Sequence, residues 1–183
     1  MFKHFEPFQL FELLIIQLKG IFALKIVGMR FLVLIMVCFL GLNSYAQLDR
    51  KSIYSALASD SKELVQKQLD ALENVKESSE LKAFKGALQM KAAQFQKTAK
   101  AKMDLFNAGK KTLESEIKSN DGNVEYRFLR LLIQENAPKQ LKYNGNIDED
   151  VLAIMAGYSK LKESAKTALE AYAKKSSSLK GLL

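Results

Sequence analysis

The sequence contains few of the residues that most enzymes and metal sites use. Its 183 residues include one histidine, one cysteine, no tryptophan and two prolines. His4 and Cys38 both precede residue 47, where we predict that an exported mature chain begins, so that chain would contain neither residue type. This excludes serine–histidine and cysteine–histidine catalysis, zinc sites with the usual ligands, disulfides and thiol redox chemistry. We therefore expect no cofactor, no metal and no enzymatic activity.

Residues 29–46, MRFLVLIMVCFLGLNSYA, have the three parts of a secretory signal peptide. Arg30 provides the basic start, residues 31–42 form the apolar run, and the pattern Ser-Tyr-Ala at 44–46 predicts cleavage before Gln47. The apolar run is shorter than the about 20 residues of a membrane-spanning helix. The sequence thus predicts export to the periplasm or the cell surface. The alternative is an uncleaved signal segment that anchors the chain, and this would be its only contact with the membrane.

Residues 1–28 do not fit this signal peptide, because a signal that began at Met1 would be longer than the usual 15–30 residues or so. We interpret them as an over-long start, with translation beginning at Met29. A genuine N-terminal extension is the alternative. Residues 47–183 are long enough to bury roughly two thirds of their unfolded surface, which predicts a single domain. Its net charge would be +6, compared with +8 for the whole chain.

The chain after Gln47 has the composition and periodicity of helices, with no alternating apolar–polar runs typical of strands. Apolar residues at helical spacing, capping patterns and turn signals predict seven helices joined by short loops. Short loops favour antiparallel neighbours, so we expect an all-α, compact antiparallel array of about seven helices. The predicted helices cover 50–58, 60–76, 81–99, 102–119, 124–136, 146–158 and 161–175.

Four local expectations follow from these patterns. Leu64 falls on the apolar stripe of the second helix, and Gly109 falls on that of the fourth. Because glycine costs about 1 kcal/mol in a helix relative to alanine, we expect a neighbouring helix to approach closely at Gly109. Residues 176–178, three serines, are expected to begin a frayed tail. Met90, Met103 and Met155 are interpreted as core filler.

The predicted helix 124–136, VEYRFLRLLIQEN, is apolar around most of its circumference, which is typical of a helix in the middle of a bundle. Arg127, Arg130 and Gln134 nevertheless share one stripe of it. Buried charge is costly unless it is paired, so two interpretations stay open. The arginines form salt bridges with the acidic run at 148–150, or the stripe lines a polar groove that binds an extended peptide of a protein partner or an anionic group.

Lysines concentrate in the third and fourth predicted helices. Such runs are usually solvated faces, but they also attract acidic partners or an anionic surface. No nucleic-acid-binding motif is present, so we expect no nucleic acid partner. The lysine zone comprises Lys82, Lys85, Lys91, Lys97, Lys100, Lys102, Lys110 and Lys111.

Residues 109–126, GKKTLESEIKSNDGNVEY, resemble the second helix of a tetratricopeptide repeat, its turn and the start of the next helix. Asp121 stands near the usual turn proline, and no 34-residue self-similarity appears elsewhere, so the resemblance implies one or two degenerate repeats. The mature chain also resembles a group of small exported bacterial proteins of unknown function. The residues that match are NVEYRFLRLLIQENAPKQLKY at 123–143, followed by Asn-Ile-Asp at 146–148. This resemblance implies export and a helical domain, and the resemblance at residues 109–126 implies that the domain is tetratricopeptide-like.

Together these features predict an exported scaffold or adaptor that binds a protein or peptide without catalysis, through Arg127, Arg130 and Gln134. One alternative is a basic periplasmic chaperone for unfolded envelope proteins. A hydrolase that uses only carboxylates is the second alternative, although no pair of acidic residues is placed in a cleft by the sequence.

Overall fold

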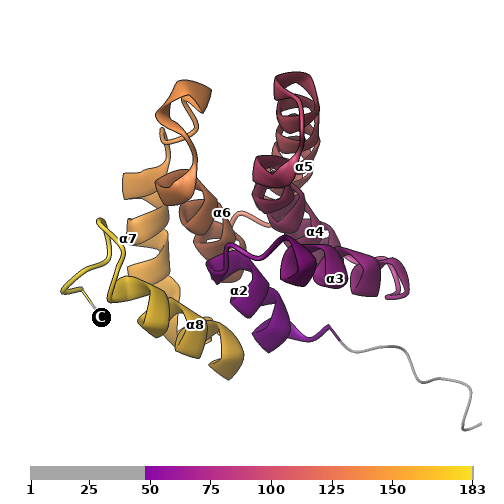
Figure 1. The fold of residues 1–183 in the computed structure, drawn as a ribbon. Helices are drawn as coiled ribbons and strands as arrows, with labels where there is room; N and C mark the ends of the chain where they lie inside the picture. Colours follow the sequence, from indigo (N-terminus) through magenta and orange to yellow (C-terminus); the bar gives the residue numbers. More distant parts are fainter. Residues whose placement is uncertain (1–47, 183) are drawn as a thin grey trace, which may run out of the picture. The chain divides into compact units, whose positions relative to one another are not determined.

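The computed structural model describes residues 48–182, which contain seven α-helices, three short 3₁₀ turns and no strand (Figure 1). The signal peptide at 29–46 and the over-long start at 1–28 lie outside the described residues. The all-α prediction is confirmed, with the predicted number of helices. The helices are α2 (Arg50–Ala58), α3 (Lys62–Glu73), α4 (Ser79–Ala92), α5 (Ala99–Ser119), α6 (Val124–Asn136), α7 (Ile147–Gly157) and α8 (Glu163–Ala173).

Helix α6 lies at the centre of the array, as its apolar circumference predicts. Ten of its 13 residues are buried, and Phe128, Leu129 and Leu131 are completely inaccessible. Asn123 caps the helix by accepting hydrogen bonds from the backbone N–H groups of residues 125 and 126. At the other end α6 stops at Asn136, two residues before Pro138, because the residue that precedes a proline disfavours helical geometry.

Helices α4 and α5 form an antiparallel pair whose backbones touch at two glycines. A Cβ atom built on Gly109 would lie 2.5 Å from the carbonyl oxygen of Gly86, and one on Gly86 would lie 2.8 Å from the carbonyl oxygen of Gly109. At the far end of the pair, the Ser79 hydroxyl donates a 2.5 Å hydrogen bond to Glu116. The close approach expected at Gly109 is therefore confirmed, and its partner is Gly86.

Most of the predicted helix bounds agree with the structure, and the differences have local causes. The second predicted helix begins later, because Ser61 rather than Asp60 is the cap, and it ends at Glu73. The third ends at Ala92, where the chain turns through residues 93–95 before Thr98 caps α5. Leu64 is 43% exposed, so its expected place in the core was wrong. Val65 and Leu72 instead form the buried side of α3.

The segment after α8 is held in place rather than frayed. Glu135 of α6 accepts hydrogen bonds from the hydroxyls of Ser176, Ser177 and Ser178, each at 2.7 Å, and from the backbone N–H of Ser178 at 2.9 Å. Leu179 is completely buried. Sequence reasoning failed here because serines are weakly ordered on their own, and the carboxylate that fixes them is about 40 residues away in the chain.

The hydrogen bonds from residues 176–178 make the free energy of unfolding depend on the ionisation of Glu135. Burial raises the pKa of the Glu135 carboxyl, but hydrogen bonds from Tyr172 and the three serines outweigh it and lower the pKa from 4.5 to about 2. A depressed pKa in the folded state stabilises the fold above pH 4.5, and this stabilisation is lost as the pH falls towards 2. We expect Glu135→Gln to lower the free energy of unfolding by about 1–2 kcal/mol at pH 7.

The same variant should approach wild-type stability as the pH falls from 4.5 to about 2, because the wild-type carboxylate is then neutralised. Urea denaturation followed by circular dichroism measures the free energy of unfolding of wild type and variant at pH 7 and at pH 3. Glu73→Gln, on the exposed side of α3, is the control and should change stability by less than about 0.5 kcal/mol. An equal loss for Glu135→Gln at pH 7 and pH 3 would contradict the assignment.

Among residues 48–182, none of the helices combines the length and the apolar character that crossing a membrane requires.

Candidate functional site

The predicted polar stripe of α6 meets the acidic run at the start of α7. The guanidinium of Arg130 donates two hydrogen bonds to the Asp150 carboxylate, from Nη2 to Oδ1 at 2.6 Å and from Nε to Oδ2 at 2.8 Å. Its third nitrogen, Nη1, donates to Glu114 of α5 at 2.9 Å. Asp150 is completely buried and Arg130 is 4% exposed. This two-pronged geometry is the strongest form of arginine–carboxylate contact.

Gln134 and Arg127 extend the network in both directions. The Gln134 side chain donates to Asp150 at 2.8 Å and accepts from the backbone N–H of Asn146 at 3.0 Å, which places the start of α7. Arg127 donates to Glu149 at 2.6 Å, and Glu149 is half exposed. Asn146 and Glu149 have the spacing of a capping box, but the Asn146 side chain makes no cap hydrogen bond to the backbone of α7.

Burial and ion pairing compete at this network. Burial raises the pKa of the Asp150 carboxyl, and the two arginines partly oppose that rise. Burial lowers the pKa of Arg130, but Asp150 and Glu114 outweigh it, so the pKa is raised. The hydroxyl of Tyr143 donates to Glu114 at 2.5 Å, and burial together with that carboxylate raises the pKa of Tyr143.

The structure thus brings Arg127, Arg130 and Gln134 together, as their spacing predicts, and joins them to residues 149 and 150. The polar groups of Arg130 and Gln134 are bonded within the fold, to α5, α7 and the backbone at Asn146. In Arg127, Nε is buried without a hydrogen-bond partner among the described residues. The network connects three helices, and it reaches solvent at Glu149 and, less, at Glu114.

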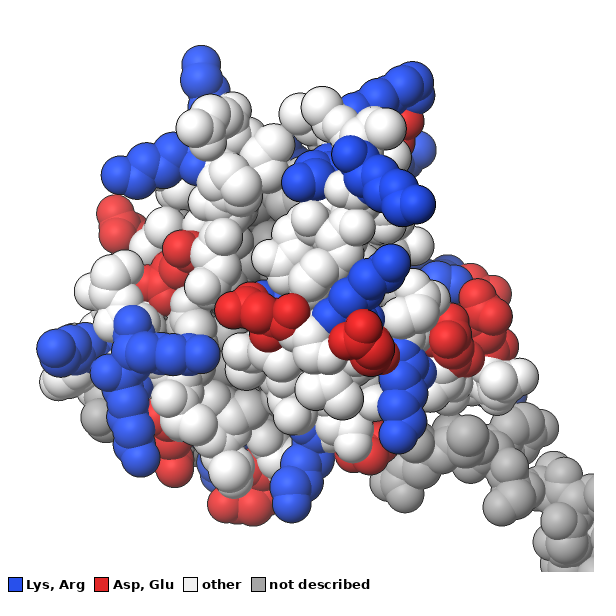
Figure 2. All heavy atoms as spheres, in the orientation of Figure 1, with Lys and Arg blue, Asp and Glu red and all other residues white. Residues whose placement is uncertain are grey.

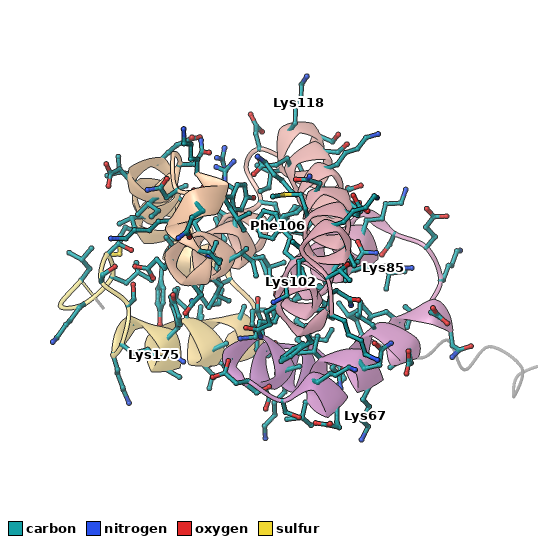
Figure 3. All side chains as sticks on the ribbon, turned by 45° about the horizontal axis from the view of Figure 1, so that its top comes forward. Lys67, Lys85, Lys102, Phe106, Lys118 and Lys175 are labelled. Carbon is teal, nitrogen blue, oxygen red and sulfur yellow. The ribbon has the colours of Figure 1, made fainter. Side chains whose placement is uncertain are left out.

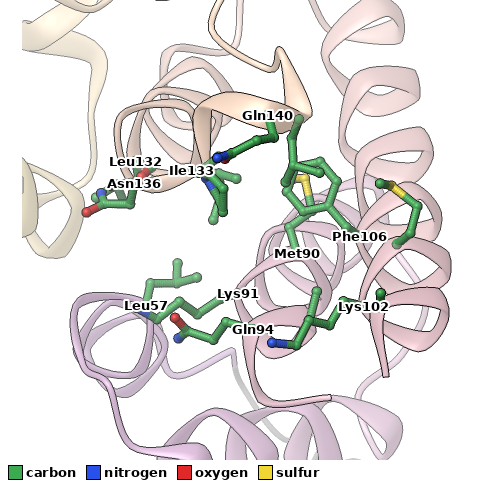
Figure 4. A pocket seen from close by; sticks show the side chains of 16 residues that line it. Leu57, Met90, Lys91, Gln94, Lys102, Phe106, Leu132, Ile133, Asn136 and Gln140 are labelled. Carbon is green, nitrogen blue, oxygen red and sulfur yellow. Dashed lines mark hydrogen bonds between the residues drawn. The ribbon is translucent and has the colours of Figure 1, made fainter. Parts of the chain in front are cut away.

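An apolar groove lies on the other side of α6, and sequence reasoning did not find it. We call it the α5–α6 groove. It has a volume of about 310 Å³, which is near the lower end of the range for ligand pockets. Figure 4 shows Leu132, Ile133 and Asn136 of α6 along one side, Leu57 of α2 opposite them, and Met90 and Phe106 at one end. Its other lining residues are Lys91, Ala93, Gln94, Ala99, Lys102, Met103, Ala137, Pro138, Gln140 and Leu141.

The polar groups at this groove are amides and lysines. Gln94 and Gln140 are exposed, and the side-chain amide of neither has a hydrogen-bond partner within residues 48–182. Lys102 is exposed on the side of α5 that borders the groove, near Phe106 (Figure 3), and no carboxylate of the described residues pairs with it. None of the groove's lining residues is acidic, so an occupant meets an apolar floor and a positively charged rim.

Met103 is the residue that sequence reasoning placed wrongly at this groove. It was expected in the core, yet it is 45% exposed, and Met155 on α7 is 37% exposed. Met90 is buried as expected. Met103 lies one helical turn before the buried Phe106, at the edge of the apolar stripe of α5, so the spacing of the stripe alone did not distinguish rim from core.

The lysine zone does not form one uniform face. Lys82, Lys91 and Lys100 are paired with acidic side chains, and Lys110 lies over the ring of Tyr143. Figure 2 shows basic side chains spread around the whole outline of one face, with acidic side chains between several of them. This mixture is typical of a solvated surface.

No group of three or more His, Cys, Asp or Glu side chains within residues 48–182 has a geometry that would hold a metal ion. No family model, curated protein or solved structure matches this chain. The helix–turn–helix of α5 and α6 agrees with the helical pattern of residues 109–126, whereas their assignment to a tetratricopeptide repeat stays a prediction.

Proposed function

We propose that this protein is a non-enzymatic binding protein of the bacterial envelope, and that it holds a short segment of a partner protein in the α5–α6 groove. The observation on which the proposal rests is the combination of an apolar floor, free amides and a rim without acidic residues. Export to the periplasm or cell surface, and a tetratricopeptide-like arrangement of α5 and α6, are parts of the same proposal. They rest on residues 29–46 and on the resemblance at residues 109–126.

The composition of the groove favours a peptide segment over other apolar ligands. Exposed Met103 and the adjoining Met90 have unbranched side chains that adapt to different apolar side chains. Gln94 and Gln140 each offer a donor and an acceptor, which suits the backbone of an extended segment. Lys102 would pair with an acidic residue of the partner segment that lies next to the apolar side chains the segment buries in the groove. The preferred segment therefore combines apolar anchors with an adjacent Asp or Glu.

The polar stripe has a different role in this proposal. Arg130 and Gln134 orient α7 against α6, and the α5–α6 groove, rather than the stripe of Arg127, Arg130 and Gln134, makes the contact with the partner. Catalysis is not part of the proposal, because the groove offers no acid, base or nucleophile beyond lysine amines.

Binding is tested by affinity capture from a native envelope extract with three forms of the protein. We expect the wild type to retain one dominant partner. Met103→Glu should lose at least nine tenths of it, because the new carboxylate on the apolar rim would have to be desolvated and would repel the acidic residue of the partner segment. Leu152→Glu is the matched control: Leu152 is 71% exposed on α7 and lies outside the groove, so capture should be unchanged.

The outcomes separate the proposed functions. A broad set of unfolded envelope proteins, lost equally with Met103→Glu, would indicate the chaperone rather than the adaptor. Capture that both glutamate variants leave unchanged would contradict binding at the α5–α6 groove. Circular dichroism of each variant verifies that the fold is retained.

A further inference from the structure

A second apolar groove lies between α2 and α8, with α6 beneath it. Glu80 pairs with both Arg50, the first residue of α2, and Lys162, the cap residue of α8, so the two helices begin side by side. The two helices contact each other. This α2–α8 groove has a volume of about 420 Å³ and is lined by Lys51, Tyr54, Ser55, Ala58, Phe128, Leu132, Ser164, Thr167, Ala168, Ala171, Tyr172 and Lys175.

The floor of the α2–α8 groove is aromatic, and its hydroxyls are engaged with the protein. The rings of Tyr54 and Phe128 lie 5.5 Å apart between centroids, and those of Phe128 and Tyr172 lie 6.2 Å apart. The Tyr54 hydroxyl donates to Glu125 at 2.9 Å, and the Tyr172 hydroxyl accepts from Asn136 at 3.0 Å. The floor therefore presents hydrocarbon to an occupant rather than polar groups.

The walls are built from small side chains. Ser55 and Ala58 come from α2, and Ser164, Ala168 and Ala171 come from α8. Ser164 and Tyr172 are eight residues apart on α8, so the α8 wall is about 12 Å long. The groove has no side-chain amide, which distinguishes it from the α5–α6 groove. The hydroxyls of its walls belong to Ser55, Ser164 and Thr167, and that of Thr167 already donates to the Glu163 carbonyl at 3.0 Å. The groove therefore suits a slim unbranched chain better than a peptide, whose backbone groups would find few partners.

Both charged residues of this groove are lysines. Lys51 stands at the end where α2 and α8 begin, and Lys175 follows the end of α8, so they lie towards opposite ends of the groove. Within residues 48–182 neither of them forms an ion pair, and no acidic residue lines the groove. Lys175 lies 5.6 Å above the ring of Tyr172, at the edge of the aromatic floor. An apolar chain in the groove thus has an ammonium group at each end for a negatively charged head.

We infer that the α2–α8 groove is a binding site for an anionic single-chain amphiphile, of the class of long-chain fatty acids. The acyl chain lies on the rings of Tyr54, Phe128 and Tyr172, and Lys51 or Lys175 pairs with the head group. This site is separate from the α5–α6 groove, although Leu132 borders both.

Binding is measured by titrating the purified protein with dodecanoate, below its micelle concentration, against a bound fluorescent fatty acid. We expect saturable displacement by dodecanoate. Dodecyltrimethylammonium, which has the same chain and the opposite charge, should bind at least tenfold more weakly. Ala171→Trp should abolish binding by filling the groove, and because Ala171 is exposed the fold should be retained.

Charge reversal locates the head group. We expect Lys51→Glu or Lys175→Glu to weaken dodecanoate binding at least tenfold, whereas Lys174→Glu, an exposed neighbour that does not line the groove, should leave it unchanged. Met103→Glu should also leave it unchanged, which separates this site from the α5–α6 groove. The inference is overturned if dodecanoate does not bind, if the cationic amphiphile binds equally well, if neither Lys51→Glu nor Lys175→Glu weakens binding, or if Ala171→Trp binds like the wild type.

Discussion

Replacing Arg130 with alanine is expected to lower the free energy of unfolding by about 3–5 kcal/mol, the largest effect of any single substitution proposed for this protein. Asp150 is completely buried and receives two of its hydrogen bonds from Arg130. Without the guanidinium, the carboxylate either remains charged in an apolar environment or takes up a proton at neutral pH. Either outcome destabilises the folded state of the variant relative to that of the wild type. Chemical denaturation followed by circular dichroism measures the loss.

Two further variants make this result specific. Arg127→Ala should cost only about 1 kcal/mol, because its shorter contact is with half-exposed Glu149. Combining Arg130→Met with Asp150→Asn should recover at least half of the loss, because the buried charge is removed and an acceptor remains for Gln134. A loss below about 1 kcal/mol for Arg130→Ala would contradict the structural role of the pair.

Gly109→Ala is expected to destabilise the protein by about 2–3 kcal/mol, against the usual direction of this substitution. In an exposed helix, replacing glycine with alanine stabilises by about 1 kcal/mol. At Gly109, however, the new methyl group would lie 2.5 Å from the Gly86 carbonyl oxygen and 2.9 Å from the Met90 backbone nitrogen. These atoms belong to the backbone of α4, so α4 and α5 have to separate along a core that includes Leu88 and Leu113.

The control for this prediction is Gly122→Ala, in the turn between α5 and α6. A Cβ atom there meets nothing within 4 Å, and stability should change by less than about 0.5 kcal/mol. Thermal or urea denaturation of both variants tests the pair. A stabilised Gly109→Ala protein would mean that α4 and α5 do not meet at this point.

The helices could be predicted from the sequence because each depends on local signals. Asn123 caps α6 and Pro138 ends it, and both act within a few residues. Apolar periodicity also identified α6 as the central helix, and Gly109 indicated a close approach before its partner was known. The partner itself, Gly86, became evident only from the packing of α4 against α5.

The contacts between distant residues could be predicted only in part. The alternative in which Arg127 and Arg130 pair with residues 148–150 agrees with the structure. It could be predicted because an arginine on a buried helix needs a carboxylate partner to offset the cost of burying its charge. Glu114, which completes the network, lies on α5 and gave no such signal. The two grooves arise where three or four helices leave space between them, and no periodicity within one helix encodes such a space.

Residues at the edges of apolar helix stripes were the hardest to interpret. Met103 and Leu64 belong to apolar stripes, yet both are more than 40% exposed, because the neighbouring helices cover only part of each stripe. The serines at 176–178 present the converse case, since polar residues without helical periodicity are fixed by a distant carboxylate. In both cases burial depends on the arrangement of helices rather than on local sequence.

Site-specific photocrosslinking tests the central claim, that the α5–α6 groove holds a segment of a partner protein, most directly. A photoreactive amino acid at position 103, on the rim of the groove, is compared with the same amino acid at exposed position 152 of α7. We predict that position 103 crosslinks one partner, at a peptide that contains apolar residues beside an Asp or Glu, and that position 152 does not. Crosslinking of that partner at position 152 but not at 103 would contradict the claim.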